Sequence, residues 1–360
     1  MSLFADIKKN FGSFQLNVRL DTGGRAGDSR AQTVLGILGA SGAGKSLTLK
    51  CIAGLIRPDA GRIVLNGRTL FDSEKRIDLP PRKRHVGYLF QNYALFPHMT
   101  VYENVLCALS AEKSRAAKGE AAKQALSLME LWELRDRRPG QLSGGQKQRA
   151  ALSRIIASRP EILLFDEPFS ALDSHLREKL AVELQLFLQH MDLEAVIVSH
   201  SRDEIYKLCS DTAILEQGTV LLQKDTKALF ADPEILAASI LTGCKNHAAA
   251  VPASGQRVFV PEWGITLETG REIPADITHV GIRAHSFSEE ISENAFPVKD
   301  TAGTEEPFEQ LIRFRYASQD PSSEMLWQRR PKGNEHLPER LGVRPAEVLL
   351  LRKRGFLDEC

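Results

Sequence analysis

The 360-residue sequence has few features that would tie it to a membrane, an oxidising compartment or a strongly charged partner. Its five cysteines lie far apart with no CxxC pair, so neither a disulfide framework nor a zinc site is indicated. A net charge of +1 gives no overall attraction to nucleic acid or anionic lipid. No apolar run approaches the roughly 18 residues that span a bilayer, and the start of the chain lacks the pattern of a secretory signal. We therefore expect a protein of the reducing cytoplasm that has no nucleic-acid partner and is held at any membrane by other subunits.

What is present is the composition of an ordinary globular protein, with 42% hydrophobic and 26% charged residues, in a length that allows roughly two or three domains. Two segments with continuous apolar runs, ILLFDEP at 162–168 and EAVIVSH at 194–200, are typical of strands buried on both faces of a parallel sheet. From about residue 100 to 160, apolar residues recur at helical spacing instead. Beyond residue 243, short β-rich segments alternate with Gly and Pro. These patterns predict an α/β core with a helical insert, followed by a small all-β part.

Residues 39–46, GASGAGKS, match the phosphate-loop pattern G-x-x-x-x-G-K-[ST] between a predicted strand and a predicted helix. Glycines let backbone N–H groups turn toward phosphate oxygens, and the start of the helix adds partial positive charge. Lys45 would neutralise the β and γ oxygens of ATP, and the hydroxyl of Ser46 would bind Mg²⁺. The predicted nucleotide-binding residues of this loop are Gly39, Ala40, Ser41, Gly42, Ala43, Gly44, Lys45, Ser46 and Leu47.

Two adjacent carboxylates follow the buried strand in ILLFDEP. Asp166 would hold the Mg²⁺, which keeps much of its hydration shell and prefers oxygen ligands. Glu167 would then be the general base that orients and deprotonates the water attacking the γ-phosphate. Adjacent carboxylates are often only a solvated turn, but the four apolar residues before them and Pro168 after them favour a site.

A second anion-binding sequence lies in LSGGQKQRA, residues 142–150. Ser143, Gly144 and Gly145 place a hydroxyl and two glycines before a helical pattern, which favours anion binding. The phosphate loop already surrounds one triphosphate, so the motifs alone leave open which phosphate this segment serves.

With these motifs in this order, residues 1 to about 240 resemble the ATPase subunits of ABC transporters, and LSGGQ separates that family from other phosphate-loop NTPases. The resemblance implies an ABC-type ATPase domain over 1–240, with a helical subdomain at about 92–160. It also assigns three more residues. Gln91 would reach Mg²⁺ and the attacking water, Asp173 in SALD would cross the dimer interface, and His200 would contact the γ-phosphate.

The resemblance also implies partners. Two copies would close head to tail as a homodimer, with Ser143, Gly144, Gly145 and Gln146 of one copy on the ATP bound by the other. The surface at the aromatic and apolar loop 93–98 would receive a short helix from integral membrane permease subunits. A substrate-binding protein would act indirectly, so the subunit would be peripheral at the cytoplasmic face of the membrane. Ordinary packing against the helical insert would also explain apolar residues in this loop.

An aromatic residue before the phosphate loop stacks on adenine in this family. Phe11 is the predicted residue, and Phe14 is the alternative because its place in an alternating strand suggests a core position. The segment GRAGDSRAQ lengthens the approach to Gly39 beyond the usual spacing, which leaves the choice between the two open.

Residues 199–218, 241–246 and 280–287 resemble importer ATPases for molybdate and related oxyanions. This resemblance implies a C-terminal β-rich regulatory domain over 245–360, of the oligonucleotide-fold-like, molybdate-binding type. The domain would either bind an oxyanion or only dimerise, and Arg283, His285 and Ser286 would be either anion ligands or an exposed strand end. Importers of sulfate, polyamine, sugar or iron are the nearest alternatives. A non-transport ABC ATPase acting on nucleic acid or ribosomes is the alternative of another class.

Overall fold

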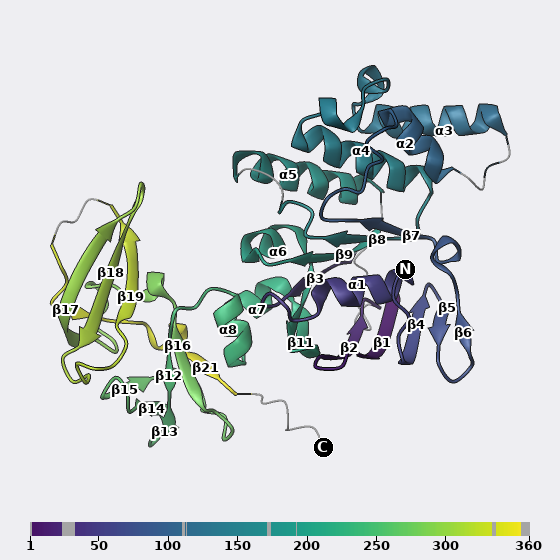
Figure 1. Cartoon of the computed structure of the whole chain (residues 1–360). Coiled ribbons are helices and arrows are strands. Elements are labelled where there is room, and N and C mark those ends of the chain that lie inside the picture. The colour runs from purple at the N-terminus through teal and green to yellow at the C-terminus, as the bar shows by residue number, and fades with distance from the viewer. Residues whose placement is uncertain are drawn as a thin grey trace. The chain divides into compact units, whose positions relative to one another are not determined.

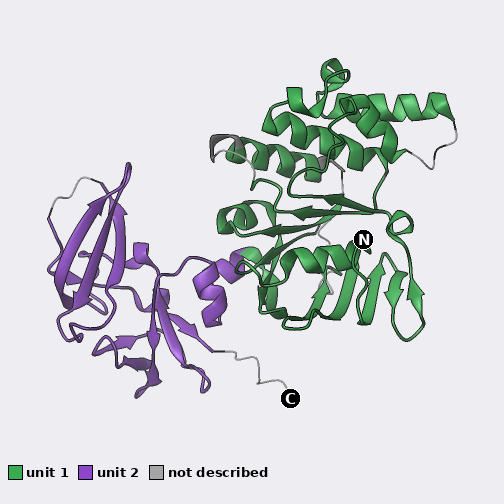
Figure 2. Ribbon diagram, viewed as in Figure 1, with its two compact units in different colours: residues 1–226 green, residues 227–360 purple. Residues whose placement is uncertain are grey.

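The computed structural model describes residues 2–23, 33–109, 112, 114–170, 174–191, 193–332 and 336–353. The chain divides into two compact units, residues 1–226 and 227–360 (Figure 2), and each is described by itself. The domain limits predicted from the sequence, 1–240 and 245–360, place the junction later in the chain and stay a prediction. No helix among the described residues has the length and apolar character needed to cross a bilayer.

The first unit contains a mixed sheet in which eleven described strands run in the order β6-β5-β4-β1-β2-β11-β10-β3-β9-β8-β7. Strand β3 pairs in parallel with β9 and β10, and β8 pairs in parallel with β7 and β9, whereas β1, β2, β4, β5 and β6 form antiparallel pairs. The strands are β1 (Leu3–Asn10), β2 (Gln15–Asp21), β3 (Val34–Leu38), β4 (Ala60–Leu65), β5 (Arg68–Asp72), β6 (Ile77–Asp78), β7 (Val86–Leu89), β8 (Ile162–Asp166), β9 (Glu194–Ser199), β10 (Asp211–Glu216) and β11 (Thr219–Asp225).

Burial along the strands explains this arrangement. Every residue of β3, β8 and β9 is buried. For β8 and β9, the continuous apolar runs predicted strands covered on both faces. Strand β2 alternates exposed and buried residues, which fits a strand with one face toward the core. Parallel strands β3, β9 and β8 are therefore covered on both faces within one half of the sheet, and their carboxyl ends come together at one edge of the sheet.

The helices of the first unit are α1 (Lys45–Ala53), α2 (Val101–Ala108), α3 (Arg115–Leu128), α4 (Gly144–Ala157), α5 (Ser174–Met191) and α6 (Arg202–Leu208). Figure 1 shows α2, α3 and α4 grouped together beyond β7 and β8, which is the helical part predicted from the sequence. Capping boxes begin two of them: Thr100 with Glu103 starts α2, and Ser143 with Gln146 starts α4. Local sequence therefore determines where both helices begin.

The second unit is mainly β, as predicted. Its helices are α7 (Thr226–Ala231) and α8 (Leu236–Leu241), and its strands are β12 (Asn246–Ala249), β13 (Val251–Pro252), β14 (Arg257–Val260), β15 (Ile265–Glu268), β16 (His279–Ile282), β17 (Phe296–Glu305), β18 (Glu309–Tyr316), β19 (Leu326–Pro331), β20 (Arg340–Leu341) and β21 (Leu349–Leu351). The strands form sheets of order β12-β16-β21, β13-β14-β15 and β19-β18-β17-β20. Buried Trp263, Phe287, Phe314 and Tyr316 pack edge to face or tilted in one core.

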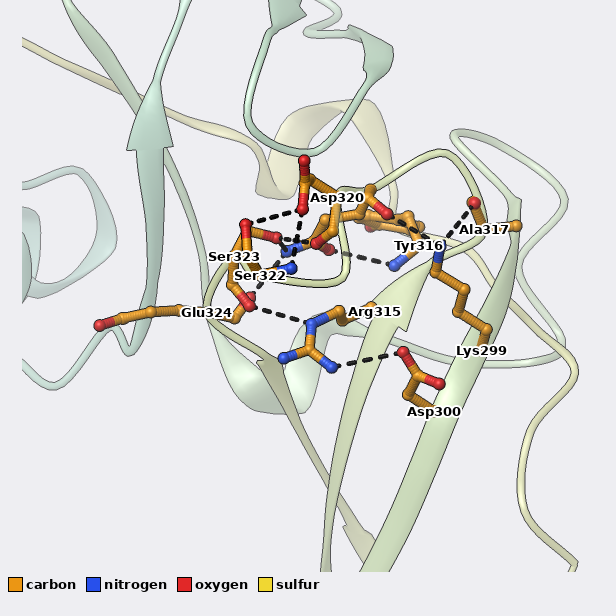
Figure 3. A network of polar contacts seen from close by, with 10 residues as sticks. Lys299, Asp300, Arg315, Tyr316, Ala317, Asp320, Ser322, Ser323 and Glu324 are labelled. Carbon is orange, nitrogen blue, oxygen red and sulfur yellow. Dashed lines mark hydrogen bonds and ion pairs between the residues drawn. The ribbon is translucent and has the colours of Figure 1, made fainter.

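A polar network fixes the turn after β18 (Figure 3). Lys299 donates hydrogen bonds to the carbonyl oxygens of Ala317 (3.0 Å) and Gln319 (2.8 Å), and Arg315 donates to that of Ser323 (2.9 Å). The turn lacks regular pairing, so these side-chain donors satisfy its carbonyl groups. The network therefore stabilises the backbone of this turn.

Candidate functional site

The phosphate loop connects the end of β3 to the start of α1. Gly42 and Gly44 have φ values of 81° and 105°, which favour glycine, and Gly44 is the N-cap of α1. A Cβ on Gly39 would lie 2.3 Å from the carbonyl oxygen of Leu215. The loop conformation therefore needs glycine both for its backbone angles and for its close packing against β10.

The ammonium group of Lys45 lies over this loop. It donates hydrogen bonds to the carbonyl oxygens of Gly39 (2.7 Å) and Ala40 (2.9 Å), and the residue is only 6% exposed. Burial lowers the pKa of Lys45, and the negative charges of Glu167 and Asp166 oppose that change. Two nearby carboxylates thus favour the charged form that a phosphate ligand requires.

Asp166, at the end of β8, accepts two hydroxyl hydrogen bonds. Ser46 Oγ donates to Oδ1 at 2.6 Å, and Tyr88 Oη donates to Oδ2 at 2.8 Å. A serine hydroxyl and a carboxylate oxygen that converge in this way are the hard oxygen donors that Mg²⁺ prefers, so the two predicted ligands fit that ion. Tyr88 was not predicted from the sequence, although its place three residues before Gln91, on a strand that ends at the site, was a usable signal.

Glu167 follows Asp166 and has the uncommon φ of 49° for a residue other than glycine. Its backbone N–H donates to the carbonyl oxygen of Val198 (3.0 Å), which ties it to β9. Its side chain lies between the other two predicted catalytic residues: Gln91 Nε2 is 3.4 Å from Oε2, and His200 Nδ1 is 3.5 Å from Oε1. The structure therefore brings the predicted base, glutamine and histidine together at the carboxyl ends of β7, β8 and β9.

A cavity of about 390 Å³ opens beside the loop. It is lined by Phe11, Phe14, Ser41, Gly42, Ala43, Gly44, Lys45, Ser46, Leu47 and Glu167. Phe11 is 38% exposed, whereas Phe14 packs against the core, and their ring centroids are 6.4 Å apart. Both aromatic candidates therefore flank the phosphate loop, and Phe11 has the more accessible ring.

The second anion-binding segment begins α4 and does not line this cavity. Ser143 is the N-cap, its Oγ accepts from the Gln146 N–H (3.3 Å), and Gln146 Oε1 accepts from the Ser143 N–H (3.0 Å). Gly144 opens the helix, and Gly145 lies close to Leu180 of α5. Residues 143–146 are thus held by their own capping hydrogen bonds and do not line the cavity beside the phosphate loop of the same chain. The predicted interface residue Asp173 lies outside the described residues.

Side-chain hydrogen bonds from α2 and α4 fix the backbone of the loop at residues 93–98. Arg154 donates hydrogen bonds to the carbonyl oxygens of Tyr93 (3.0 Å) and Ala94 (2.7 Å), and the amide of Asn104 donates to the carbonyl of Phe96 (3.1 Å). The Tyr93 side chain is buried, whereas Phe96 is 43% exposed. The tyrosine therefore packs inside the unit, as ordinary packing predicts, whereas Phe96 is exposed to solvent; contact of this loop with a permease stays a prediction.

In the second unit, Arg283 binds main-chain groups. Its guanidinium donates to the carbonyl oxygens of Thr242 (3.0 Å) and Phe230. His285 is exposed, and Ser286 is buried with its N–H donating to the Arg283 carbonyl. The Arg283 guanidinium thus links the strand end at residue 283 to the helical segment that begins this unit, through the carbonyl groups of Phe230 and Thr242.

Comparison with known proteins gives a consistent set of relatives. Residues 27–170 match the family model described as "ABC transporter". An Fe(3+) ions import ATP-binding protein of Haemophilus influenzae is 40% identical over 229 residues, covering 63% of this chain and 61% of the relative. A molybdenum import ATP-binding protein of Paramagnetospirillum magneticum is 37% identical over 228 residues, covering 63% and 60%. A probable sulfate/thiosulfate import ATP-binding protein of Chlorella vulgaris is 40% identical over 220 residues, covering 61% and 89%.

The match therefore spans about three fifths of the iron and molybdenum relatives and most of the sulfate relative. Among solved structures, the dimeric, post-hydrolysis state of the ATP-binding cassette MJ0796 bound to ADP and Pi is similar. It is 26% identical with a TM-score of 0.51, covering 63% of this chain and 99% of that chain. The expected ABC-type fold of the first unit is thereby confirmed.

Proposed function

Because the chain belongs to the ABC transporter family of ATP-binding proteins, we propose that it is the ATP-hydrolysing motor subunit of an ABC importer. One observation carries the proposal. Glu167 lies within 3.5 Å of both Gln91 and His200, beside the phosphate loop. Such a cluster serves attack on a phosphate bound to the loop, since nucleotide binding alone needs no general base.

The proposed chemistry uses residues at one edge of the sheet. Glu167 accepts a proton from a water molecule as the water oxygen forms a bond to the γ-phosphorus and the bond to the ADP oxygen breaks. His200 and Gln91 orient this water and the γ-phosphate, and Lys45 neutralises charge on the phosphate oxygens.

Magnesium would be held by Ser46 and Asp166, with Gln91 as a further oxygen ligand. When bound, it supplies positive charge to the phosphate oxygens. The hydroxyl groups of Ser46 and Tyr88 each donate a hydrogen bond to one oxygen of Asp166, so both carboxylate oxygens have a defined position.

The site would be completed by a second copy of the chain. Ser143, Gly144, Gly145 and Gln146 are capped and ordered, yet they lie outside the cavity of their own chain. A symmetric head-to-tail pair would place them, with Asp173, on the ATP held by the partner, which makes two shared sites. The dimeric state named for the MJ0796 structure supports this arrangement.

The remaining partners follow from the importer assignment. Permease subunits in the membrane would contact the loop containing exposed Phe96, Pro97 and His98, and a substrate-binding protein would act through the permease. The subunit would then be peripheral at the cytoplasmic face of the membrane. Recovery of an integral permease with the tagged chain from membranes would distinguish this function from that of a non-transport ABC ATPase.

For the transported substrate we propose molybdate or tungstate, on the resemblance of residues 199–218, 241–246 and 280–287 to that group. The relatives divide among iron, molybdenum and sulfate import, so sulfate and iron are the leading alternatives. ATPase activity of the assembled transporter, measured with binding protein loaded with molybdate, tungstate, sulfate or iron, separates them. Stimulation by iron alone would overturn the oxyanion assignment.

The central test of ATP hydrolysis is the Glu167→Gln variant. It should lower ATP turnover by at least about 10²-fold, the usual loss when a general base is removed. ATP binding should persist, because the phosphate loop and Mg²⁺ ligands are unchanged. Near-normal phosphate release by this variant would refute the assignment of Glu167.

A further inference from the structure

We propose that Tyr88 is a positioning residue for Asp166, through which it sets the affinity of the site for Mg²⁺; this inference rests on the proposed function. Tyr88 lies on β7, and its hydroxyl donates to Asp166 Oδ2 at 2.8 Å. Ser46 donates to the other oxygen, Oδ1, at 2.6 Å. The two carboxylate oxygens therefore have separate partners on opposite sides.

The strand register explains how Tyr88 reaches this carboxylate. Strands β7 and β8 are parallel neighbours, and Tyr88 is paired with Leu164, two residues before Asp166. Residues two apart on a strand share a face, so Leu164 and Asp166 point the same way. A long tyrosine side chain that leans along its strand spans the remaining distance, which a shorter hydroxyl side chain would not.

The tyrosine ring is itself held in place. Its centroid is 4.4 Å from that of Phe90, and it packs against the core cluster of the first unit. The packing of the ring therefore holds the hydroxyl beside Asp166 Oδ2.

This division of the carboxylate has a consequence for metal binding. With Oδ2 held by Tyr88, rotation of the carboxyl group is restricted and Oδ1 stays directed at Ser46, the other predicted Mg²⁺ ligand. Partners of this kind orient metal ligands, and their loss typically weakens metal affinity about 10- to 100-fold. If the Tyr88 ring served only the hydrophobic core, Tyr88→Phe would not change the Mg²⁺ affinity, because phenylalanine keeps the ring.

The test is Tyr88→Phe in the full chain, which removes one oxygen atom and keeps the ring. Equilibrium binding of a fluorescent ATP analogue is measured across a MgCl₂ titration and also without Mg²⁺. We expect the Mg²⁺ concentration at half-maximal effect to rise about 10-fold. Binding without Mg²⁺ should stay as in the wild type, and the thermal midpoint should fall only by the amount expected for the loss of one hydrogen bond.

Two further variants make the result specific. Tyr316→Phe is the matched control, because the buried hydroxyl of Tyr316 makes no hydrogen bond within the part of the chain that is described, and it should leave the Mg²⁺ midpoint unchanged. Asp166→Asn should raise the midpoint by itself. Adding Tyr88→Phe to that variant should raise it no further, because Tyr88 acts through Asp166.

A Tyr88→Phe midpoint within twofold of the wild type would overturn the inference. A loss of Mg²⁺-free binding as large as the loss of Mg²⁺-dependent binding would also overturn it, because it would indicate a packing role. So would a further increase of the Mg²⁺ midpoint in the Asp166→Asn background. A wild-type chain that binds the analogue without any response to Mg²⁺ overturns the proposed function, and this inference with it.

Discussion

Replacing Arg84 by methionine should destabilise the first unit strongly, because this fully buried guanidinium holds the end of α1 remote from the phosphate loop. Nη1 donates to the carbonyl oxygens of Cys51 (2.9 Å) and Ile52 (2.8 Å) in the last turn of the helix. Nε donates to the carbonyl oxygen of Leu79 (2.7 Å), and Nη2 pairs with Asp78 (3.0 Å). Methionine fills similar space with a flexible apolar chain and offers no donor.

The size of the effect follows from the groups left behind. A buried acceptor without a donor costs about 1–3 kcal/mol. The Cys51 carbonyl keeps a hydrogen bond from the Gly54 N–H (3.1 Å), and the Asp78 side chain is 36% exposed, so water can replace the guanidinium there. The carbonyls of Ile52 and Leu79 are the main losses, and with the lost charged hydrogen bonds we expect about 3–5 kcal/mol.

Urea unfolding of the full chain, followed by far-ultraviolet circular dichroism with and without ATP, measures this loss. The transition that ATP moves to higher urea reports the first unit, since a ligand stabilises the part that binds it. Arg84→Lys keeps the charge but has one compact donor group, so it should recover only part of the stability. A loss below about 1 kcal/mol for Arg84→Met would refute the reasoning from unsatisfied carbonyl groups.

Two further predictions concern the nucleotide pocket and the residues behind His200. Phe11→Ala should weaken ATP binding, measured by calorimetry, about 10-fold through lost stacking. Phe14→Ala should mainly lower the thermal midpoint, measured by melting. If the two effects were exchanged, Phe14 would be the adenine contact. Burial raises the pKa of Glu204, although a hydrogen bond from Ser199 (2.6 Å) opposes it. The stabilisation that comes with the raised pKa of Glu204 should be fully present below pH 4.5, the ordinary pKa of this group. It should be lost as pH rises above 4.5 and through the pKa in the folded state. Glu204→Gln should therefore flatten the unfolding free energy against pH in this range, and an unchanged slope would contradict that.

The phosphate loop, the carboxylate pair and the buried parallel strands could be predicted from the sequence because each depends on neighbours along the chain. Gly42 and Gly44 must adopt positive φ within a few residues, and Asp166 and Glu167 directly follow the strand that positions them. The alternation of β1 was equally legible, with buried Leu3, Ala5 and Ile7, but no strand was predicted there.

Contacts between distant segments could not be predicted in the same way. The hydrogen bond from Tyr88 to Asp166 depends on the parallel register of β7 and β8, and nothing in either segment's sequence specifies that pairing. The buried position of Arg84 beneath α1 is likewise a tertiary result, since nothing in its local sequence specifies the distant carbonyl groups that it binds. Arg283 was considered as an anion ligand, whereas the fold directs it to main-chain carbonyls.

The shared ATP site is tested most directly by mixing two inactive variants, Glu167→Gln and Ser143→Arg, and measuring phosphate release. In a mixed dimer both lesions fall on one composite site, and the other site combines the intact Glu167 of one copy with the intact Ser143 of its partner. With random pairing, an equal mixture should regain up to about a quarter of wild-type turnover, although each variant alone stays inactive. If the mixture remains as inactive as its components under conditions where wild-type dimers turn over, each site is built from one chain and the account is contradicted.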